Sequence, residues 1–190
     1  SKARPLWINQ LSQLDQIWVV SKMAKEVLIK AGINDQKIFI VPEGFNPEIF
    51  NSEVKAIKKK QERFRFLTVG KPEKRKSTIE IIESFKKAFK EQDQAELLIH
   101  FPEFAVGKKD LPYLEEVYAL AKTRPNQIEI QVKSFSDSYL AKLYASSDCY
   151  ISLAKAEGWG LPLMEAMATG TPVIAYNYHG QAEYLNGDFG

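Results

Sequence analysis

The sequence predicts an α/β protein built on a parallel β-sheet with helices on both faces. Short apolar stretches alternate with longer amphipathic ones along the chain, and this alternation is typical of repeated βα units. The 190 residues are 45% hydrophobic and 26% charged, as in an ordinary globular protein with one substantial core. We therefore expect parallel strands whose carboxyl ends meet at one edge of the sheet, where open α/β sheets bind ligands.

The predicted strands are short runs rich in β-branched and aromatic residues. In chain order they are IWVV (17–20), KIFIV (37–41), RFLTV (65–69), ELLIHF (96–101), IEIQV (128–132), CYISL (149–153) and TPVIA (171–175).

Apolar residues at helical spacing predict helices between these strands. The stretch 78–92 has one apolar face, formed by Ile79, Ile82, Phe85 and Phe89. Gly32 is a stop signal for the helix that follows the first strand. Further helices are predicted within 112–123, 136–147 and 162–170.

Residues 43–63 break the alternation of strands and helices. Prolines and glycines punctuate the start of this stretch, and three consecutive lysines flanked by glutamates follow. We interpret 43–63 as a solvated linker rather than a nucleic-acid patch, since no aromatic residues are interleaved with the lysines. Such a linker would separate residues 1–42 from residues 64–190.

Charge, cysteine content and hydropathy narrow the function classes. The formal net charge is only +2, so no global field marks a nucleic-acid binder. The single cysteine, Cys149, lies in an apolar run, which excludes a disulfide framework and favours a reducing, cytoplasmic location. No apolar run approaches the length that crosses a bilayer, and no His, Cys and carboxylate residues cluster at metal-ligand spacing.

The stretch EGWGLPLMEAMATG after the sixth predicted strand is the first candidate site. Gly158 and Gly160 would let the backbone turn tightly beside a ligand, and Pro162 suits the first turn of a helix. The free N–H groups of that helix start would attract an anion. Glu157 would lie in the loop and Glu165 about one turn into the helix. Helix capping is the alternative for Glu165, because a glutamate in a first turn stabilises a helix by roughly 0.3–1 kcal/mol without any ligand.

The stretch GKPEKRKS after the strand 65–69 is the second candidate site. Gly70 ends the strand, and Lys71, Lys74, Arg75 and Lys76 follow before a helix that begins at about Thr78. Arginine holds phosphate oxygens with two parallel hydrogen bonds, and lysine acts as a point charge. We expect Lys71, Arg75 and Lys76 to contact phosphate and Lys74 to be solvated.

These motifs resemble those of the group 1 retaining glycosyltransferases, which have the GT-B fold. Glu157 and Glu165, with GWGLP between them and EAMATGTPVIA after, are similar to the E-x7-E motif of that family. The loop from Gly70 to Lys76 resembles its diphosphate-binding loop, with Lys71 where arginine is common and Ser77 where glycine is usual. The segment HGQAE at 179–183 is similar to its Gly-Gly-x-x-Glu segment, with His179 replacing a glycine. The resemblance extends over about 17–190.

The resemblance implies a fold and residue roles. Residues 64–190 would be the nucleotide-sugar-binding, Rossmann-like C-terminal half of a GT-B enzyme, and 1–42 the end of its N-terminal half. It implies that Lys76, helped by Arg75, neutralises the leaving diphosphate, and that Gly70 and Lys71 complete this loop. Glu157 would contact sugar hydroxyls and Glu165 ribose hydroxyls. The donor would also meet the loop of Gly158, Trp159, Gly160 and Leu161.

The resemblance also implies where the base and the acceptor would bind. The base would lie near Val132 to Phe135. Trp159 is either a stacking surface or a loop anchor, and Glu183 either orients a hydroxyl or starts a helix. No metal cofactor is expected. The acceptor would be bound mainly by an N-terminal domain outside this chain, so we expect this chain alone to be inactive or nearly so, and membrane association of the full-length protein is left open.

Two alternatives to donor binding in a transferase stand beside this interpretation. One is a nucleotide-sugar epimerase, and the other a non-catalytic nucleotide-sugar-binding domain. A dinucleotide-dependent oxidoreductase is disfavoured, because GKPEKRKS lacks the G-x-G-x-x-G arrangement.

Overall fold

The computed structural model describes residues 5–59 and 62–185, and these divide into two compact units. Unit 1 contains 5–44, Ala156–Leu161 and 177–185, and unit 2 contains Phe45–Lys155 and Pro162–Tyr176. Each unit has its own parallel sheet, of two strands in unit 1 and five in unit 2. The chain therefore enters unit 1 just before the predicted E-x7-E motif and returns to unit 2 within it.

Unit 1 is a small α/β arrangement around a two-stranded sheet. Its first strand pairs in parallel with its second, with Ile17 opposite Ile38, and both side chains are buried with Ile33. The Ser21 hydroxyl caps the intervening helix by accepting from the backbone N–H of Ala24 at 3.3 Å. The elements are α1 (Pro5–Leu11), β1 (Ile17–Val19), α2 (Lys22–Lys30), η1 (Asp35–Lys37), β2 (Ile38–Ile40) and η5 (His179–Glu183). Helix α1 was not among the predicted elements.

Unit 2 contains the five-stranded sheet, in the order β5-β4-β3-β6-β7, and every pair is parallel. The strands are β3 (Phe64–Val69), β4 (Ala95–Phe101), β5 (Ile128–Val132), β6 (Cys149–Ser152) and β7 (Val173–Ala175). The predicted α/β class with a parallel sheet is confirmed. Strand order reverses at β3, whose neighbours are β4 and β6, so the loops after β3 and β6 leave the sheet at its switch point.

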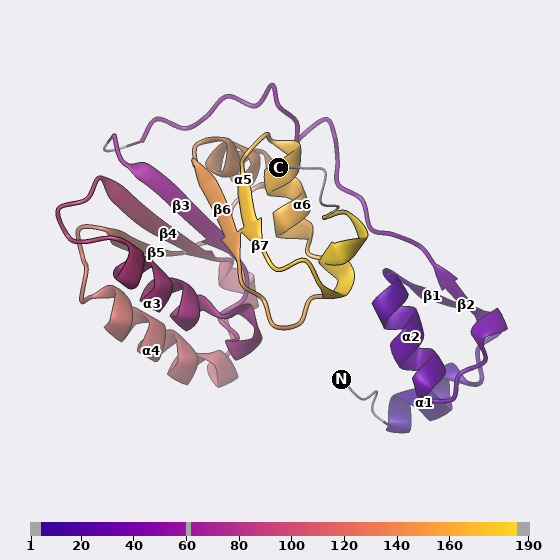
Figure 1. Ribbon diagram of the computed structural model, residues 1–190. Coiled ribbons are helices and arrows are strands. Elements are labelled where there is room, and N and C mark those ends of the chain that lie inside the picture. The colour runs from indigo at the N-terminus through magenta and orange to yellow at the C-terminus, as the bar shows by residue number, and fades with distance from the viewer. Residues whose placement is uncertain (1–4, 60–61, 186–190) are drawn as a thin grey trace. The chain divides into compact units, whose positions relative to one another are not determined.

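Helices lie along both faces of the sheet in unit 2. Helices α3 and α4 run side by side along one face (Figure 1). Because βαβ crossovers are right-handed, α5 and α6, which lead to strands on the other side of β3, cover the opposite face. The helices are α3 (Thr78–Ala88), α4 (Leu111–Ala121), α5 (Asp137–Ala145) and α6 (Leu161–Ala168), with short helices η2 (Lys74–Lys76), η3 (Glu103–Ala105) and η4 (Lys108–Asp110).

The core beneath α3 differs in detail from the predicted helical face. Ile82 and Phe85 are buried as predicted, but Ile81 is also buried, and Ile79 is only partly covered. Phe89 follows the helix rather than belonging to it, since its backbone is extended at φ −121° and ψ 142°. Helix α3 therefore ends at Ala88, four residues before the end that the pattern predicted.

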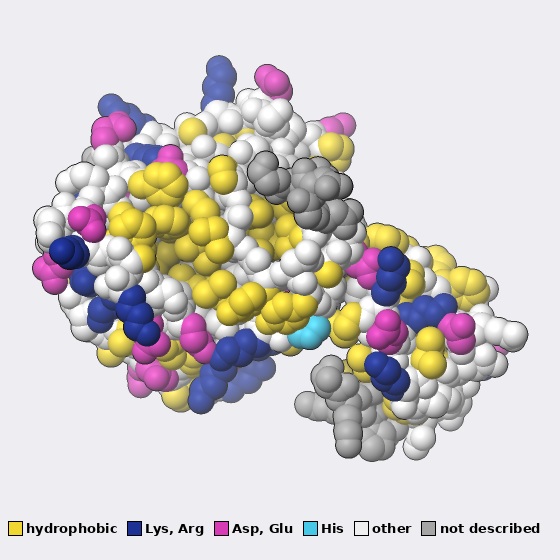
Figure 2. Space-filling view, viewed as in Figure 1, with side chains coloured by type: hydrophobic (Ala, Val, Ile, Leu, Met, Phe, Trp, Pro, Cys, Tyr) yellow, Lys and Arg dark blue, Asp and Glu magenta, His cyan; other side chains and the backbone are white. Residues whose placement is uncertain are grey.

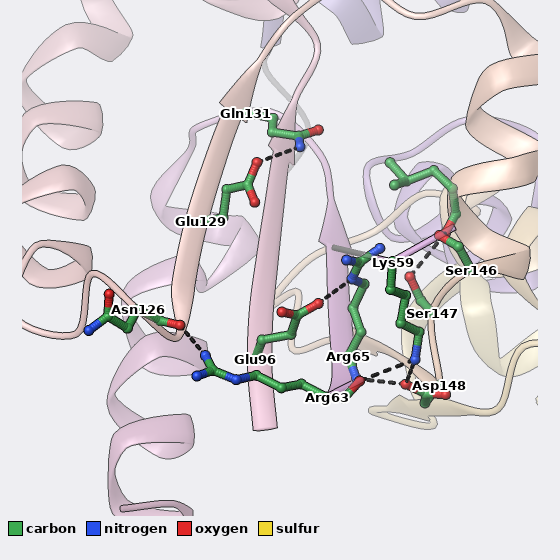
Figure 3. Close-up of polar contacts among 11 residues, drawn as sticks. Lys59, Arg63, Arg65, Glu96, Asn126, Glu129, Gln131, Ser146, Ser147 and Asp148 are labelled. Carbon is green, nitrogen blue, oxygen red and sulfur yellow. Dashed lines mark hydrogen bonds and ion pairs between the residues drawn. The ribbon is translucent and has the colours of Figure 1, made fainter. Parts of the chain in front are cut away.

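The segment 43–63 was predicted to be a solvated linker. It has no helix or strand among its described residues, but from Phe45 on it belongs to unit 2 and packs there. The Phe50 ring is 4% exposed and lies 6.2 Å from the ring of Tyr144. The Lys59 ammonium pairs with Asp148, whose carboxylate also accepts from the backbone N–H of Arg65 at 2.7 Å (Figure 3). Part of the lysine run is thus an anchor, because Lys59 has a carboxylate partner that lies far along the chain.

One face of unit 2 is apolar. Hydrophobic side chains gather over its strands in Figure 2, where a groove of about 300 Å³ opens between α3 and strands β3, β6 and β7. Ile174 on β7 is 51% exposed there. In the part of the chain that the structure describes, this area of the sheet is not covered by a helix.

Candidate functional site

The basic loop of unit 2 is a tight connection between β3 and α3. The backbone N–H of Gly70 donates to the carbonyl of His100 on the neighbouring strand at 3.1 Å, so the ends of β3 and β4 lie together. Ser77, just before the helix, has a left-handed backbone with φ of 58°. This sharp turn starts α3 at Thr78, as predicted.

The cations of this loop differ in their surroundings. Lys71 and Lys74 are exposed, whereas Arg75 and Lys76 are partly covered. A Cβ placed on Gly70 would lie 3.5 Å from Cδ of Lys76, so the lysine stem runs beside this glycine. The Arg75 Nε donates to Oε2 of Glu73 at 2.7 Å, so Glu73 offsets part of its charge within the loop.

The start of the β6–α6 loop is tied to the basic loop. The backbone N–H of Lys155 donates to the carbonyl of Arg75 at 2.7 Å. The Lys155 ammonium also pairs with Glu80 in the first turn of α3. The two loops predicted to face a ligand thus join at their bases within unit 2.

The rest of the β6–α6 loop, Ala156–Leu161, belongs to unit 1 and is held there by residues 180–184. The backbone N–H of Gly180 donates to the carbonyl of Glu157 at 3.1 Å. The Tyr184 hydroxyl lies 3.0 Å from the carbonyl oxygens of both Trp159 and Gly160. Gly160 has φ of 97°, and a Cβ there would lie 2.8 Å from the Tyr184 oxygen, so glycine is required at this position.

The indole of Trp159 is buried rather than displayed. It is 6% exposed, and its centroid lies 5.3 Å from that of Tyr184. This favours a loop anchor over a stacking surface for a sugar.

Glu183 has a structural partner at the start of another helix. Its Oε1 accepts from the backbone N–H of Lys22 at 2.6 Å, at the first residue of α2. A carboxylate at this position satisfies an unpaired N–H and stabilises the positive end of the helix dipole. Neither of the two roles considered from the sequence included this cap on α2.

Glu165 lies in unit 2, in the fifth position of α6, as predicted. Its Oε2 accepts a hydrogen bond from the hydroxyl of Tyr144 on α5 at 2.9 Å. Burial raises the pKa of Glu165, while the hydrogen bond from Tyr144 opposes this rise. The side chain therefore bonds across to a neighbouring helix, which does not match the capping alternative.

An aromatic stack lies at the carboxyl ends of β4 and β5, beside the loop predicted to meet the base. The His100 ring is 2% exposed and stacks on Phe135 with centroids 4.6 Å apart. Phe135 in turn contacts Tyr139 on α5 at 4.3 Å. Burial lowers the pKa of His100 to about 4, so this histidine is neutral at pH 7.

The buried His100 should make folding stability depend on pH. Its pKa is 6.5 when exposed and about 4 in the folded chain, so the unfolded chain binds the proton first as pH falls. The contribution of His100 to the free energy of unfolding is fully present above pH 6.5. It should decline by on the order of 3 kcal/mol towards pH 4. Urea unfolding of the wild type and of His100→Phe between pH 4 and pH 6.5 checks this prediction. The free energy of unfolding of the variant should depend less steeply on pH, because the variant lacks the buried histidine. Equal slopes would contradict it.

The structure places the predicted site residues in two groups. Gly70, Lys71, Arg75 and Lys76 share one loop of unit 2, and Glu165 lies on α6 of the same unit. The segment from Glu157 to Leu161 is part of unit 1. Sequence reasoning missed Tyr144 and Tyr184, because nothing local indicates which distant group a tyrosine hydroxyl will meet.

The described residues, 5–59 and 62–185, contain neither a metal-ligand cluster nor a membrane-spanning helix. They contain no group of three His, Cys, Asp or Glu side chains able to hold a metal ion. They also contain no helix long and apolar enough to span a bilayer.

Comparison with known proteins relates this arrangement to a family. The family model for glycosyl transferases group 1 matches residues 50–189, which include both candidate loops. Alpha-monoglucosyldiacylglycerol synthase of Streptococcus pneumoniae is 26% identical, over 93% of this chain and 40% of its own length. A putative glycosyltransferase, ORF313, of Acidianus filamentous virus 1 is 42% identical, over 32% of this chain and 17% of its own length.

The fold also matches solved structures. The crystal structure of Anabaena Alr3699/HepE in complex with UDP and glucose fits with a TM-score of 0.80 at 16% identity, over 95% of this chain and 50% of that one. This agrees with the predicted Rossmann-like half of a GT-B fold. The chain spans half or less of the length of each of these three proteins. With a family match over residues 50–189 and a fold in common, the chain belongs to the group 1 glycosyl transferases.

Proposed function

We propose that this chain is the donor-binding part of a retaining glycosyltransferase that transfers a sugar from a nucleoside diphosphate sugar to an acceptor. The basic loop from Gly70 to Ser77 carries the proposal. It brings Lys71, Arg75 and Lys76 to the switch point of a parallel sheet, at the start of α3, and such a place suits a diphosphate. The UDP and glucose bound to Alr3699/HepE support this choice of ligand.

In the proposed reaction the bond between the sugar and the distal phosphate breaks, and the phosphate oxygen keeps the electron pair. Negative charge therefore grows on the diphosphate as it leaves. The ammonium of Lys76 and the guanidinium of Arg75 stabilise this charge, since fixed cations in a partly desolvated site lower the barrier. The acceptor hydroxyl forms the new bond and passes its proton to the departing phosphate oxygen, with the sugar configuration retained.

The remaining residues hold the donor. Glu157 binds hydroxyls of the sugar, and Glu165 those of the ribose. Backbone N–H groups from Gly158 to Leu161 bind the sugar and the distal phosphate, and Gly70 and Lys71 complete the phosphate loop. No metal ion takes part in this proposal, so EDTA should leave the transfer rate unchanged.

The proposal also covers where the acceptor is bound and in which cellular compartment the protein acts. We assign most acceptor contacts to residues outside this chain, because it spans only 40–50% of the longer relatives it matches. The buried thiol of Cys149, which forms no disulfide, supports a reducing compartment, and we propose the cytoplasm.

Calorimetry with UDP-glucose, GDP-mannose and ADP-glucose tests donor binding by this chain. We expect one of the three to bind, and its free nucleoside to bind more weakly than the nucleoside diphosphate. A folded sample that binds none of them would overturn the proposal. In the full-length protein, donor binding without transfer or hydrolysis would instead favour a non-catalytic binding domain, and an epimerised sugar without acceptor would favour an epimerase.

A further inference from the structure

Tyr144 is the most completely enclosed aromatic residue beside the proposed donor contacts. Its side chain is 0% exposed, and its ring lies 5.8 Å from that of Tyr150 in an edge-to-face arrangement. Phe50 packs on it from the segment before β3. Its own carbonyl accepts from the hydroxyl of Thr171 at 2.9 Å. Ring and backbone are both fixed, so the direction in which the hydroxyl points is fixed as well.

The partner of that hydroxyl is unusual for a buried tyrosine. A buried phenol needs an acceptor, and a backbone carbonyl serves for Tyr150, which donates to Val69 at 3.2 Å. Tyr144 instead donates to the Glu165 carboxylate at 2.9 Å. An ionisable acceptor costs more to bury than a carbonyl does, so the packing of α5 on α6 does not by itself require this pair.

The two oxygens of Glu165 have different surroundings. Oε2 is held by Tyr144, whereas Oε1 has no hydrogen-bond donor among residues 5–59 and 62–185. A carboxylate fixed through one oxygen presents the other in a defined direction. Such an oxygen is suited to accept from the hydroxyls of a vicinal diol.

We propose that Tyr144 is a positioning residue, whose hydroxyl holds one oxygen of Glu165 so that the other is aimed at the ribose diol of the donor. This inference rests on the proposed function, in which Glu165 contacts the ribose.

The bond has a second consequence, for the charge of Glu165. Burial and the carboxylate of Asp137 on α5 raise the pKa of Glu165, and the Tyr144 hydroxyl lowers it. Removing the hydroxyl should therefore raise this pKa further. As pH falls, ribonucleotide binding that needs the ionised carboxylate would then be lost at a higher pH than in the wild type.

The test is Tyr144→Phe in the whole chain, titrated with whichever of UDP, GDP and ADP the wild type binds and with the matching 2′,3′-dideoxynucleoside diphosphate. We expect about tenfold weaker binding of the ribonucleotide and unchanged binding of the dideoxy analogue. The acid limb of ribonucleotide binding should move to higher pH. In a Glu165→Gln background, Tyr144→Phe should weaken ribonucleotide binding little further, because the positioned carboxylate is already gone.

Tyr113→Phe is the matched control, since Tyr113 is a buried tyrosine on α4 that packs in the core with α3. It should not alter the preference for ribonucleotide over dideoxynucleotide. Equal losses for both nucleotides in Tyr144→Phe, or a lower Tm with unchanged affinities and pH profile, would reduce Tyr144 to a packing role. A wild type that binds no nucleotide would instead refute the proposed function.

Discussion

Replacing Gly180 with alanine should reduce sugar transfer by the full-length protein at least ~100-fold and lower the free energy of unfolding by on the order of 1–3 kcal/mol. A Cβ at this position would lie 1.7 Å from the carbonyl oxygen of Gly158 and 2.8 Å from the backbone nitrogen of Trp159. Both are backbone atoms, so a side-chain rotation cannot relieve the clash. The loop that carries Glu157 must shift, and misplacement by about 1 Å is enough to cost two orders of magnitude in rate.

Gly44→Ala is the control for this change. A Cβ on Gly44 meets no atom within 4 Å, so the substitution should alter neither Tm nor rate. Transfer rate, donor affinity and Tm should be measured for both variants. A Gly180→Ala protein with wild-type turnover would show that the loop tolerates the shift and that its position beside Gly180 does not matter for transfer.

Replacing Lys76 with methionine should lower the transfer rate of the full-length protein by about 100-fold. Methionine keeps the apolar stem that runs beside Gly70 and removes the positive charge. The lost cation would have stabilised charge that develops as the diphosphate leaves. Affinity for the nucleotide sugar that the wild type binds should fall, while affinity for the matching nucleoside, which has no phosphate, should stay the same.

Lys74→Met in the same loop is the matched control, because Lys74 is exposed and Lys76 is partly covered. Both variants remove one positive charge, so a general loss of electrostatic attraction would affect them equally. We expect only Lys76→Met to lower the rate and to weaken binding of the nucleotide sugar while leaving binding of the matching nucleoside unchanged. Equal losses for the nucleotide sugar and the nucleoside would contradict the phosphate-binding role.

Sequence patterns identified the strands and most helices because their signals are local. Strands β3 and β4 are central and apolar, and their predicted and observed bounds differ by at most one residue at each end. The C-terminus of α3 was misplaced because apolar spacing continues to Phe89, although the backbone there is already extended. Periodicity marks which residues are buried but does not show where helical φ and ψ end.

The candidate site was predictable only as far as its motifs extend. The basic loop and the start of α3 follow from glycine, lysine and the end of a strand. The contacts that fix the site join residues that lie far apart, such as Tyr144 with Glu165 and Gly180 with Glu157. Such pairs depend on how helices and loops pack, and a single sequence has no local signal for them.

The division of the chain within its E-x7-E motif affects how donor specificity could be moved between relatives. A graft of residues 64–190 alone would follow the boundary that the sequence suggests, but it would separate α2 from Glu183, which caps it through the backbone of Lys22. In this chain, residues 5–44 form one unit with the segments Ala156–Leu161 and 177–185. In the chimaera, these two grafted segments would meet residues of the recipient protein instead of residues 5–44. A chimaera that also carries residues 5–59 would retain that cap, the packing of Phe50 on Tyr144 and the Lys59–Asp148 pair.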